Sequence, residues 1–197
     1  MLARRLTPLT LALLLFPLAG CRLLIKQSID EFKGAQGDVL LINELPDSGL
    51  MKYSGVEFEP ATTTVGDKLA PPRLLRAYDS HAQEQVEELR DVYPGGAPTL
   101  RIASEVLYFQ KKGLMSAAEC MARVRMRDGD TLIVDALVRA ESEAFTAAGE
   151  DPLAGACIKA LAKFLRSWKE DPQTERDRIR EAERKERERE RKRERDD

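Results

Sequence analysis

The sequence predicts an α+β domain: a mostly antiparallel sheet of about four strands with two helices on one face, in the order β-α-β-β-β-α, followed by a charged helical tail. Two observations lead to this prediction. Several short segments alternate apolar and polar residues with the period of a half-buried strand. Two longer segments repeat apolar residues at the three- and four-residue spacing of a helix that covers a core.

The first strand and the first helix are marked by proline and glycine. The strand is expected over Leu50–Phe58, a span rich in β-branched and aromatic residues that Pro60 closes. The helix is expected from Pro71 to about Tyr93, where Pro94 and two glycines end it. Its apolar stripe consists of Leu74, Leu75, Tyr78, Ala82, Val86, Leu89 and Tyr93.

Three further strands are expected over Thr99–Gln110, Glu119–Arg127 and Thr131–Glu141. In the last two, even-numbered residues are apolar and should face the core, so Arg123 and Arg125 belong to the opposite face. The predicted core positions are Cys120, Ala122, Val124, Met126, Leu132, Val134, Ala136, Val138 and Ala140.

This parity constrains the turn between the last two strands. A two-residue Asp-Gly hairpin would pair even-numbered residues with odd-numbered ones and put Val124 and Val134 on opposite faces. We therefore expect a three-residue turn, Asp128–Asp130 centred on Gly129, or a bulge that compensates for a shorter turn.

The second helix is expected to start with Asp151 as N-cap and Pro152 at the first helical position, and to stop near Asp171 and Pro172. Its apolar stripe consists of Leu153, Cys157, Ile158, Leu161, Phe164, Leu165 and Trp168. Two such helices should cover one face of the sheet and leave the other face, with Arg123 and Arg125, open to solvent.

The first twenty residues have the pattern of an export signal. Arg4 and Arg5 precede Leu6–Leu18, thirteen uncharged and mostly apolar residues. A bilayer span needs about twenty apolar residues, so this stretch is too short to cross one. The following motif, Leu18-Ala19-Gly20-Cys21, looks like the lipobox of bacterial lipoproteins, in which the cysteine thiol is acylated and the preceding peptide bond is cut. We expect a lipoprotein signal peptide over residues 1–20 and lipidation of Cys21.

The expected anchor divides the rest of the chain. Residues 21–48 would form a tether whose middle, Val39–Ile42, is a candidate edge strand; residues 49–170 form the α+β domain and residues 171–197 the tail. Two or three acyl chains, such as palmitate, would hold the protein at a membrane, since each buried CH₂ contributes ~0.8 kcal/mol. In similar bacterial lipoproteins, Asp directly after the lipidated cysteine is the usual signal for retention in the inner membrane. This chain has Arg22 at that position, which favours the outer membrane, facing the periplasm.

Charge argues against nucleic acid as a partner. The whole chain has a formal net charge of −2, and removal of Arg4 and Arg5 with the signal makes the remainder more acidic. The tail alternates basic and acidic residues, with pairs such as Glu181/Lys185 spaced to interact along a helix. We expect a solvated polyampholyte whose removal after Gln173 leaves thermal stability nearly unchanged; a spacer or partner contact is the alternative.

Motifs for catalysis are missing from the sequence, so we expect no enzyme, no cofactor and no metal site. The one histidine, His81, has no second ligand at metal-binding spacing and is expected to be structural. Cys120 and Cys157 both fall on inward faces. They are a candidate disulfide in an oxidising compartment, and the alternative is a pair of small buried hydrophobic residues.

The element order behind a lipobox, with MKYSGVEFEP from Met51, TLRIASEVLYFQ from Thr99 and TLIVDALVRAESEAF from Thr131, resembles small bacterial lipoproteins. The resemblance is to the domain of LpoB, the penicillin-binding-protein activator, and of the curli secretion lipoprotein, and to a related lipoprotein family of unassigned function. The resemblance implies a non-catalytic envelope protein that binds another protein.

Three hypotheses follow, none of which names a partner or an oligomeric state. The first is a lipid-anchored adaptor or accessory factor for envelope assembly or transport, which grips an envelope protein with its open sheet face or its tether. The second is a periplasmic module that binds a lipid or small ligand in an unfilled cavity lined by residues such as Val124, Val134 and Phe164. The third, a hydrolase with an unfamiliar site, would need a concave cluster of titratable groups.

Overall fold

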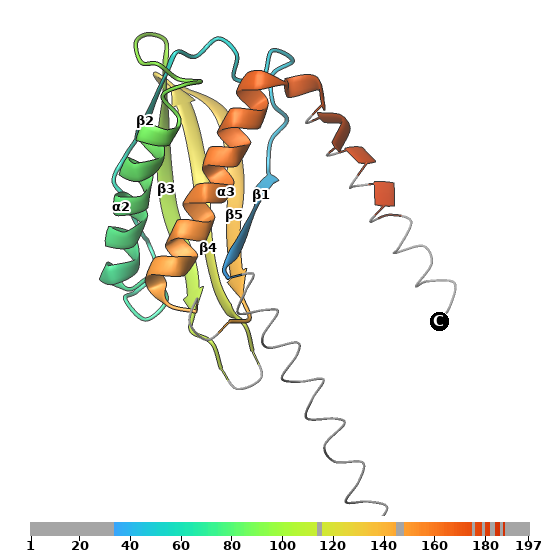
Figure 1. Ribbon diagram of the computed structural model, residues 1–197. Helices are drawn as coiled ribbons and strands as arrows, with labels where there is room; N and C mark the ends of the chain where they lie inside the picture. The colour runs from blue at the N-terminus through green and yellow to red at the C-terminus, as the bar shows by residue number, and fades with distance from the viewer. Residues whose placement is uncertain are drawn as a thin grey trace, which may run out of the picture.

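The computed structural model describes residues 34–113, 116–144 and 148–174, and in the tail residues 176–178, 180–181, 184–185 and 187. The predicted signal peptide, Cys21 and the tether up to residue 33 lie outside the described residues. The described elements follow the predicted order, with one additional strand (Figure 1). They are β1 (Gln36–Leu41), β2 (Gly55–Phe58), α2 (Pro72–Glu88), β3 (Thr99–Gln110), β4 (Ala118–Asp128), β5 (Thr131–Ser142) and α3 (Glu150–Glu170).

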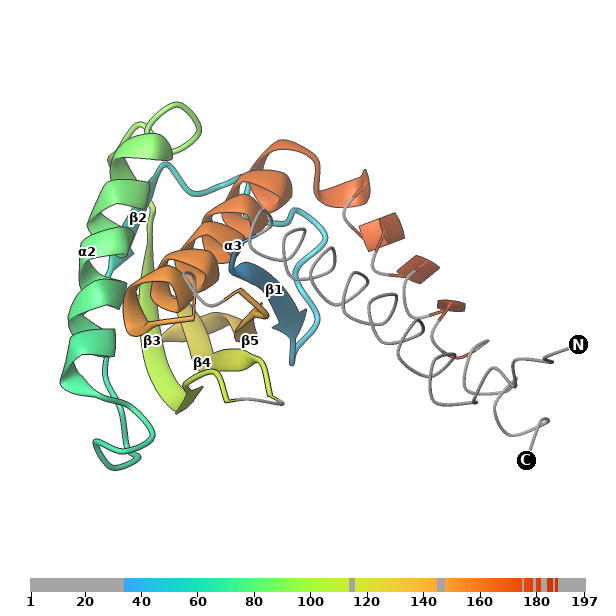
Figure 2. The same cartoon turned by 60° about the horizontal axis from the view of Figure 1, so that its bottom comes forward.

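The strands form one five-stranded sheet in the order β1-β5-β4-β3-β2. All neighbours are antiparallel except β2 and β3, which are parallel, so the sheet is mixed. Helices α2 and α3 lie side by side on one face of the sheet, and no element among the described residues covers the other face (Figure 2). The α+β class with two covering helices is confirmed. The fifth strand, β1, comes from the segment predicted as tether, where an edge strand was an option.

The start of β2 and the end of α2 differ from the prediction. At both places, buried apolar residues that were assigned to the strand or helix lie just outside it. The strand predicted from Leu50 begins only at Gly55. Leu50 lies in a turn and Tyr53 in the irregular segment after it, yet both are fully buried. Leu50 N–H donates to the Trp168 carbonyl at 3.2 Å. Helix α2 ends at Glu88, before the predicted end near Tyr93. Leu89 continues the apolar spacing because its side chain is also buried, although it lies just beyond the helix.

The parity prediction for β4 and β5 is confirmed through its second alternative. Asp128 pairs with Thr131 across a two-residue turn, and a register shift follows at once, so that Met126 pairs with Val134 and Val124 with Ala136. Even-numbered residues of both strands beyond this bulge are buried. Leu132 precedes the bulge and pairs with Arg127, so it lies on the face opposite to the other even-numbered residues. It is 41% exposed, and its predicted core position is wrong.

Helix α3 begins one residue before Asp151, which corrects the predicted cap. Gly149 is the N-cap and forms no side-chain capping bond, and Pro152 is the third helical residue. Glu150 and Asp151 lie in the first turn, where their charges interact favourably with the helix dipole. The predicted end near Asp171 is confirmed, because Asp171 is the C-cap.

The two ends of the domain have different roles. β1 starts next to the end of β5, with Gln36 opposite Glu141, so the tether would enter there, near the start of α3. The tail leaves from the opposite end of α3 (Figure 1). A domain held through Cys21 would therefore carry its tail on the end away from the tether.

Candidate functional site

The uncovered sheet face is built from cross-strand pairs of arginine and carboxylate. Arg123 on β4 donates to Asp135 on β5 through Nε at 2.9 Å and Nη2 at 2.5 Å. Arg125 Nη2 donates to Glu105 on β3 at 2.6 Å. The predicted position of Arg123 and Arg125 on this face is confirmed. The alternation of β4 places both arginines beside the odd-numbered acids of its two neighbours.

Asp135 is the most enclosed member of this array. Its side chain is 9% exposed, against 41% for Arg123. Hydrogen bonds from Arg123 hold the pKa of the Asp135 carboxyl below its usual range. Its backbone N–H donates to Asn43 Oδ1 at 2.6 Å, which replaces strand pairing where β1 leaves the sheet. Asp135 is therefore ionised at neutral pH, and the arginine that neutralises it keeps a solvent-facing edge.

The face continues with Arg139 toward the end where the tether would enter. Arg139 Nε donates to Glu119 at 2.6 Å and Nη2 donates to Glu141 at 3.1 Å. Arg101 and Glu57 form a looser pair at 3.8 Å near β2. Four arginines of this face, Arg101, Arg123, Arg125 and Arg139, each meet at least one acid, and Arg127 donates to the Asp130 carbonyl at 3.3 Å. The face therefore offers polar, geometrically specific contacts without a strong net charge.

Apolar side chains interrupt this polar array at the β1 edge. Leu40 is 59% exposed and Ile42 is 53% exposed. Leu40 lies opposite Leu137 of β5 in the register, so both side chains lie on the uncovered face. Exposed apolar side chains thus border the polar array at the β1 edge.

Cys120 on β4 and Cys157 on α3 meet in the core. Both are buried and both are free thiols in the structure. The Tyr78 hydroxyl lies 3.6 Å from Cys120 Sγ. Hydrogen bonding between the thiols lowers the pKa of Cys120 and raises the pKa of Cys157. The structure thus brings the two cysteines together, and the disulfide between them stays a prediction.

His81 lies on α2, where its ring contacts the facing helix α3. Its Nδ1 lies 3.0 Å from Glu84 Oε2. Its Nε2 is buried and lies 3.2 Å from Asp151 of α3, without the angle of a hydrogen bond. The ring packs against Gly155 with 3.1 Å between Nε2 and the place a Cβ would take. Within the described residues, no group of three or more His, Cys, Asp or Glu side chains could hold a metal ion.

Two surface pockets adjoin the helices. One, about 400 Å³, lies between the starts of α2 and α3 and includes Arg73 and Arg76. The other, about 300 Å³, lies between β1 and α3 and includes Phe164. Val124 and Val134, the other expected lining residues of a ligand cavity, line neither pocket and belong to the hydrophobic core.

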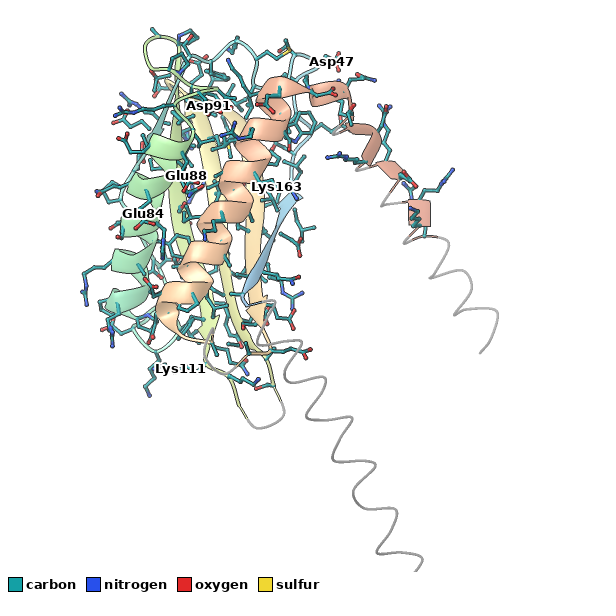
Figure 3. All side chains as sticks on the ribbon, in the orientation of Figure 1. Asp47, Glu84, Glu88, Asp91, Lys111 and Lys163 are labelled. Atoms are coloured by element: carbon teal, nitrogen blue, oxygen red, sulfur yellow. The ribbon has the colours of Figure 1, made fainter. Side chains whose placement is uncertain are left out.

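The tail contacts the domain at its first turn. Arg176 donates to the Leu45 carbonyl at 3.1 Å, pairs with Asp47 at 2.7 Å and stacks over the Trp168 ring at 5.8 Å (Figure 3 labels Asp47). Farther on, the predicted pair Glu181/Lys185 is present at 2.7 Å. The expectation of a tail without domain contacts is corrected at Arg176: its side chain, only 17% exposed, covers a buried tryptophan.

None of the described helices combines the length and the apolar character that crossing a bilayer requires. No family model and no curated protein matches the chain. Solved structures similar to it include two of the PelC dodecamer from Paraburkholderia phytofirmans, at 16% and 14% identity. Each covers 66% of this chain and 98% of the other, with a TM-score of 0.43. The hypothetical protein CT253 from Chlamydia trachomatis is 10% identical over 59% of this chain and 97% of its own, also with a TM-score of 0.43.

Proposed function

We propose that the protein is a lipid-anchored, non-catalytic adaptor or accessory factor of the cell envelope, which holds a partner protein in envelope assembly or transport. The sequence supports the anchor: a basic start, thirteen apolar residues and Leu18-Ala19-Gly20-Cys21 occur in the order that a lipoprotein precursor requires. The mature protein would sit on the outer membrane, facing the periplasm.

The uncovered sheet face is the observation that carries the adaptor role. The helices pack on one face only, and the other presents partly exposed arginines held in place by Glu105 and Asp135, beside exposed Leu40 and Ile42. Arginine is enriched at protein interfaces and among the residues that contribute most of their binding energy. From Cys21 to the first described residue, Gly34, the chain can reach about 45 Å, so this face can meet a partner away from the lipid surface.

Site-specific cross-linking tests this proposal. A photoreactive amino acid replaces Leu40 on the uncovered face or, as the matched control, Leu69, which is 43% exposed outside that face. Irradiated cells should yield one reproducible envelope protein cross-linked from position 40 and absent from position 69. Arg123→Glu, which reverses the charge of one side chain on the face, should abolish the cross-link. Equal products from both positions, or none, would contradict the adaptor role.

A further inference from the structure

The sheet ends in an unpaired edge at β1. In the described part of the chain β1 has one neighbour, β5, and the Ile42 N–H donates to the Asp135 carbonyl at 2.8 Å. Hydrogen bonding alternates along an antiparallel pair, so Leu40 and Asp38 also direct their backbone groups to β5. Gly37, Val39 and Leu41 then direct theirs away from the sheet. These groups form the free edge of the sheet.

This edge lacks the features that usually protect edge strands. Natural sheets cover their edges or place lysine, proline or a bulge in them. β1 reads QGDVLL, without lysine or proline, and its register with β5 runs without a shift from Gln36 to Leu41. One charged residue, Asp38, stands in the strand. The backbone edge is therefore open to pairing with a further strand.

A groove runs along this edge on the helix side. Its volume is about 300 Å³, and it lies between the apolar side chains of β1 and those of α3. The apolar lining is Val39, Leu41, Ala160 and Phe164. Lys163 of α3 and Arg178 of the tail supply positive charge at the groove, and Asp38 of β1 supplies one negative charge, so the groove is basic on balance (Figure 3 labels Lys163). Lys163 is exposed and forms no ion pair with the described residues.

An added strand would meet distinct surfaces on its two sides. It would lie about 4.8 Å beyond β1, with successive side chains pointing to opposite faces. Side chains on the helix side would enter the groove, where apolar groups fit the floor and acidic groups fit Lys163. Side chains on the other side would extend the uncovered face beside Leu40 and Ile42, which are exposed.

We propose that β1 binds an extended segment of a partner protein by strand addition, and that this segment has alternating apolar side chains and an acidic flank. The inference rests on the proposed adaptor function and specifies how the adaptor holds its partner. Main-chain hydrogen bonds to Gly37, Val39 and Leu41 would supply the affinity, and the groove would supply the specificity.

Binding of a designed peptide tests the inference. The probe is a fluorescent twelve-residue peptide of alternating valine and threonine with three aspartates at one end. Its control carries N-methyl groups on alternate backbone amides. The mature lipidated protein in detergent micelles is compared with Val39→Pro, which blocks the free edge, and Lys163→Glu, which leaves the backbone intact. Lys68→Glu, an exposed loop position, is the matched charge reversal.

Wild-type protein and Lys68→Glu should bind the peptide equally. Val39→Pro should weaken binding by up to about tenfold, because it removes one backbone donor at the free edge. N-methylation of the peptide should weaken binding by about tenfold or more, because two or three hydrogen bonds are lost. Lys163→Glu should weaken it by about threefold to tenfold, as expected for an exposed charge pair. Amide hydrogen exchange at Gly37, Val39 and Leu41 should slow when the peptide binds.

Several results would overturn the inference: no binding, binding that N-methylation leaves unchanged, or binding to folded Val39→Pro at wild-type strength. Slow exchange at the three amides without peptide would also overturn it. If that slow exchange depended on the protein concentration, a second copy of the chain would pair with the edge. If it did not, residues 22–33 would pair with the edge. If the Leu40 cross-link persists while the peptide fails to bind, the adaptor function stands and strand addition does not.

Discussion

Replacement of Gly37 by alanine should separate β1 from α3. A Cβ at position 37 would lie 2.4 Å from the carbonyl oxygen of Ala156 and 3.0 Å from the Ala160 Cβ. The first of these atoms belongs to the helix backbone and cannot rotate away. β1 would have to move outward by about 1 Å to reach an ordinary contact of 3.4 Å. Such a movement pulls the edge strand away from both the helix and β5.

The cost follows from overpacking against a rigid neighbour. Forcing extra volume into a packed contact typically costs 1–3 kcal/mol, and we expect about 2 kcal/mol for Gly37→Ala. For a chain of 150–250 residues this lowers Tm by about 4–8 °C. Gly66→Ala is the matched control, because nothing lies within 4 Å of the Cβ it would add. That variant should melt like the wild type or slightly higher.

Thermal unfolding followed by circular dichroism measures the global effect, and amide hydrogen exchange locates it. In wild-type protein the Asp38 and Leu40 amides should be protected by β5, and in Gly37→Ala they should exchange much faster. If Gly37→Ala melts with the wild type and keeps these amides protected, the close contact of β1 with α3 is wrong, and the free edge placed on β1 loses its support.

The remaining predictions concern the tail, the uncovered face and the thiols. Arg176→Ala should lower the free energy of unfolding by about 1 kcal/mol, measured by urea titration, because a charged hydrogen bond and a cation–π contact are lost. An unchanged urea midpoint would show that the tail does not stabilise the domain, as the sequence predicted. Arg123→Gln should lower Tm by a few degrees at pH 7. Because Arg123 lowers the pKa of Asp135, the stabilisation is complete above about pH 4 and disappears as the pH falls through the folded pKa; a difference that grows in acid would refute the pairing. After export, non-reducing mass spectrometry should find Cys120 bonded to Cys157 and the mass lower by two hydrogens, whereas two alkylatable thiols would contradict the disulfide.

The long strands were predictable because each carries enough alternating residues to define both its length and its inner face. Thr99–Gln110 matches β3 in full, and β4 and β5 extend one residue beyond the predicted ends. The parity of Val124 and Val134 required either a three-residue turn or a bulge, and the structure shows the bulge. In these strands the local pattern and the tertiary burial agree, so one implies the other.

Other features depended on contacts between residues far apart in the sequence. The apolar character of Leu50 and Tyr53 suggested strand, but these residues fill space beneath the end of α3. Arg176 packs over Trp168 because the loop with Leu45 and Asp47 lies beside it. The spacing of charges along the tail could not predict this contact. The exposed pair Leu40 and Ile42 was visible only as an apolar run, since exposure depends on which face the helices cover.

Fatty-acid labelling tests the anchored character of the protein most directly. Cells that express the full chain or its Cys21→Ser variant are grown with an alkyne analogue of palmitate, and the purified proteins are coupled to a reporter and mapped by mass spectrometry. We expect label on an N-terminal peptide that begins at Cys21, and no label on the variant. An unlabelled wild-type protein, or equal label on Cys21→Ser, would contradict the lipid anchor.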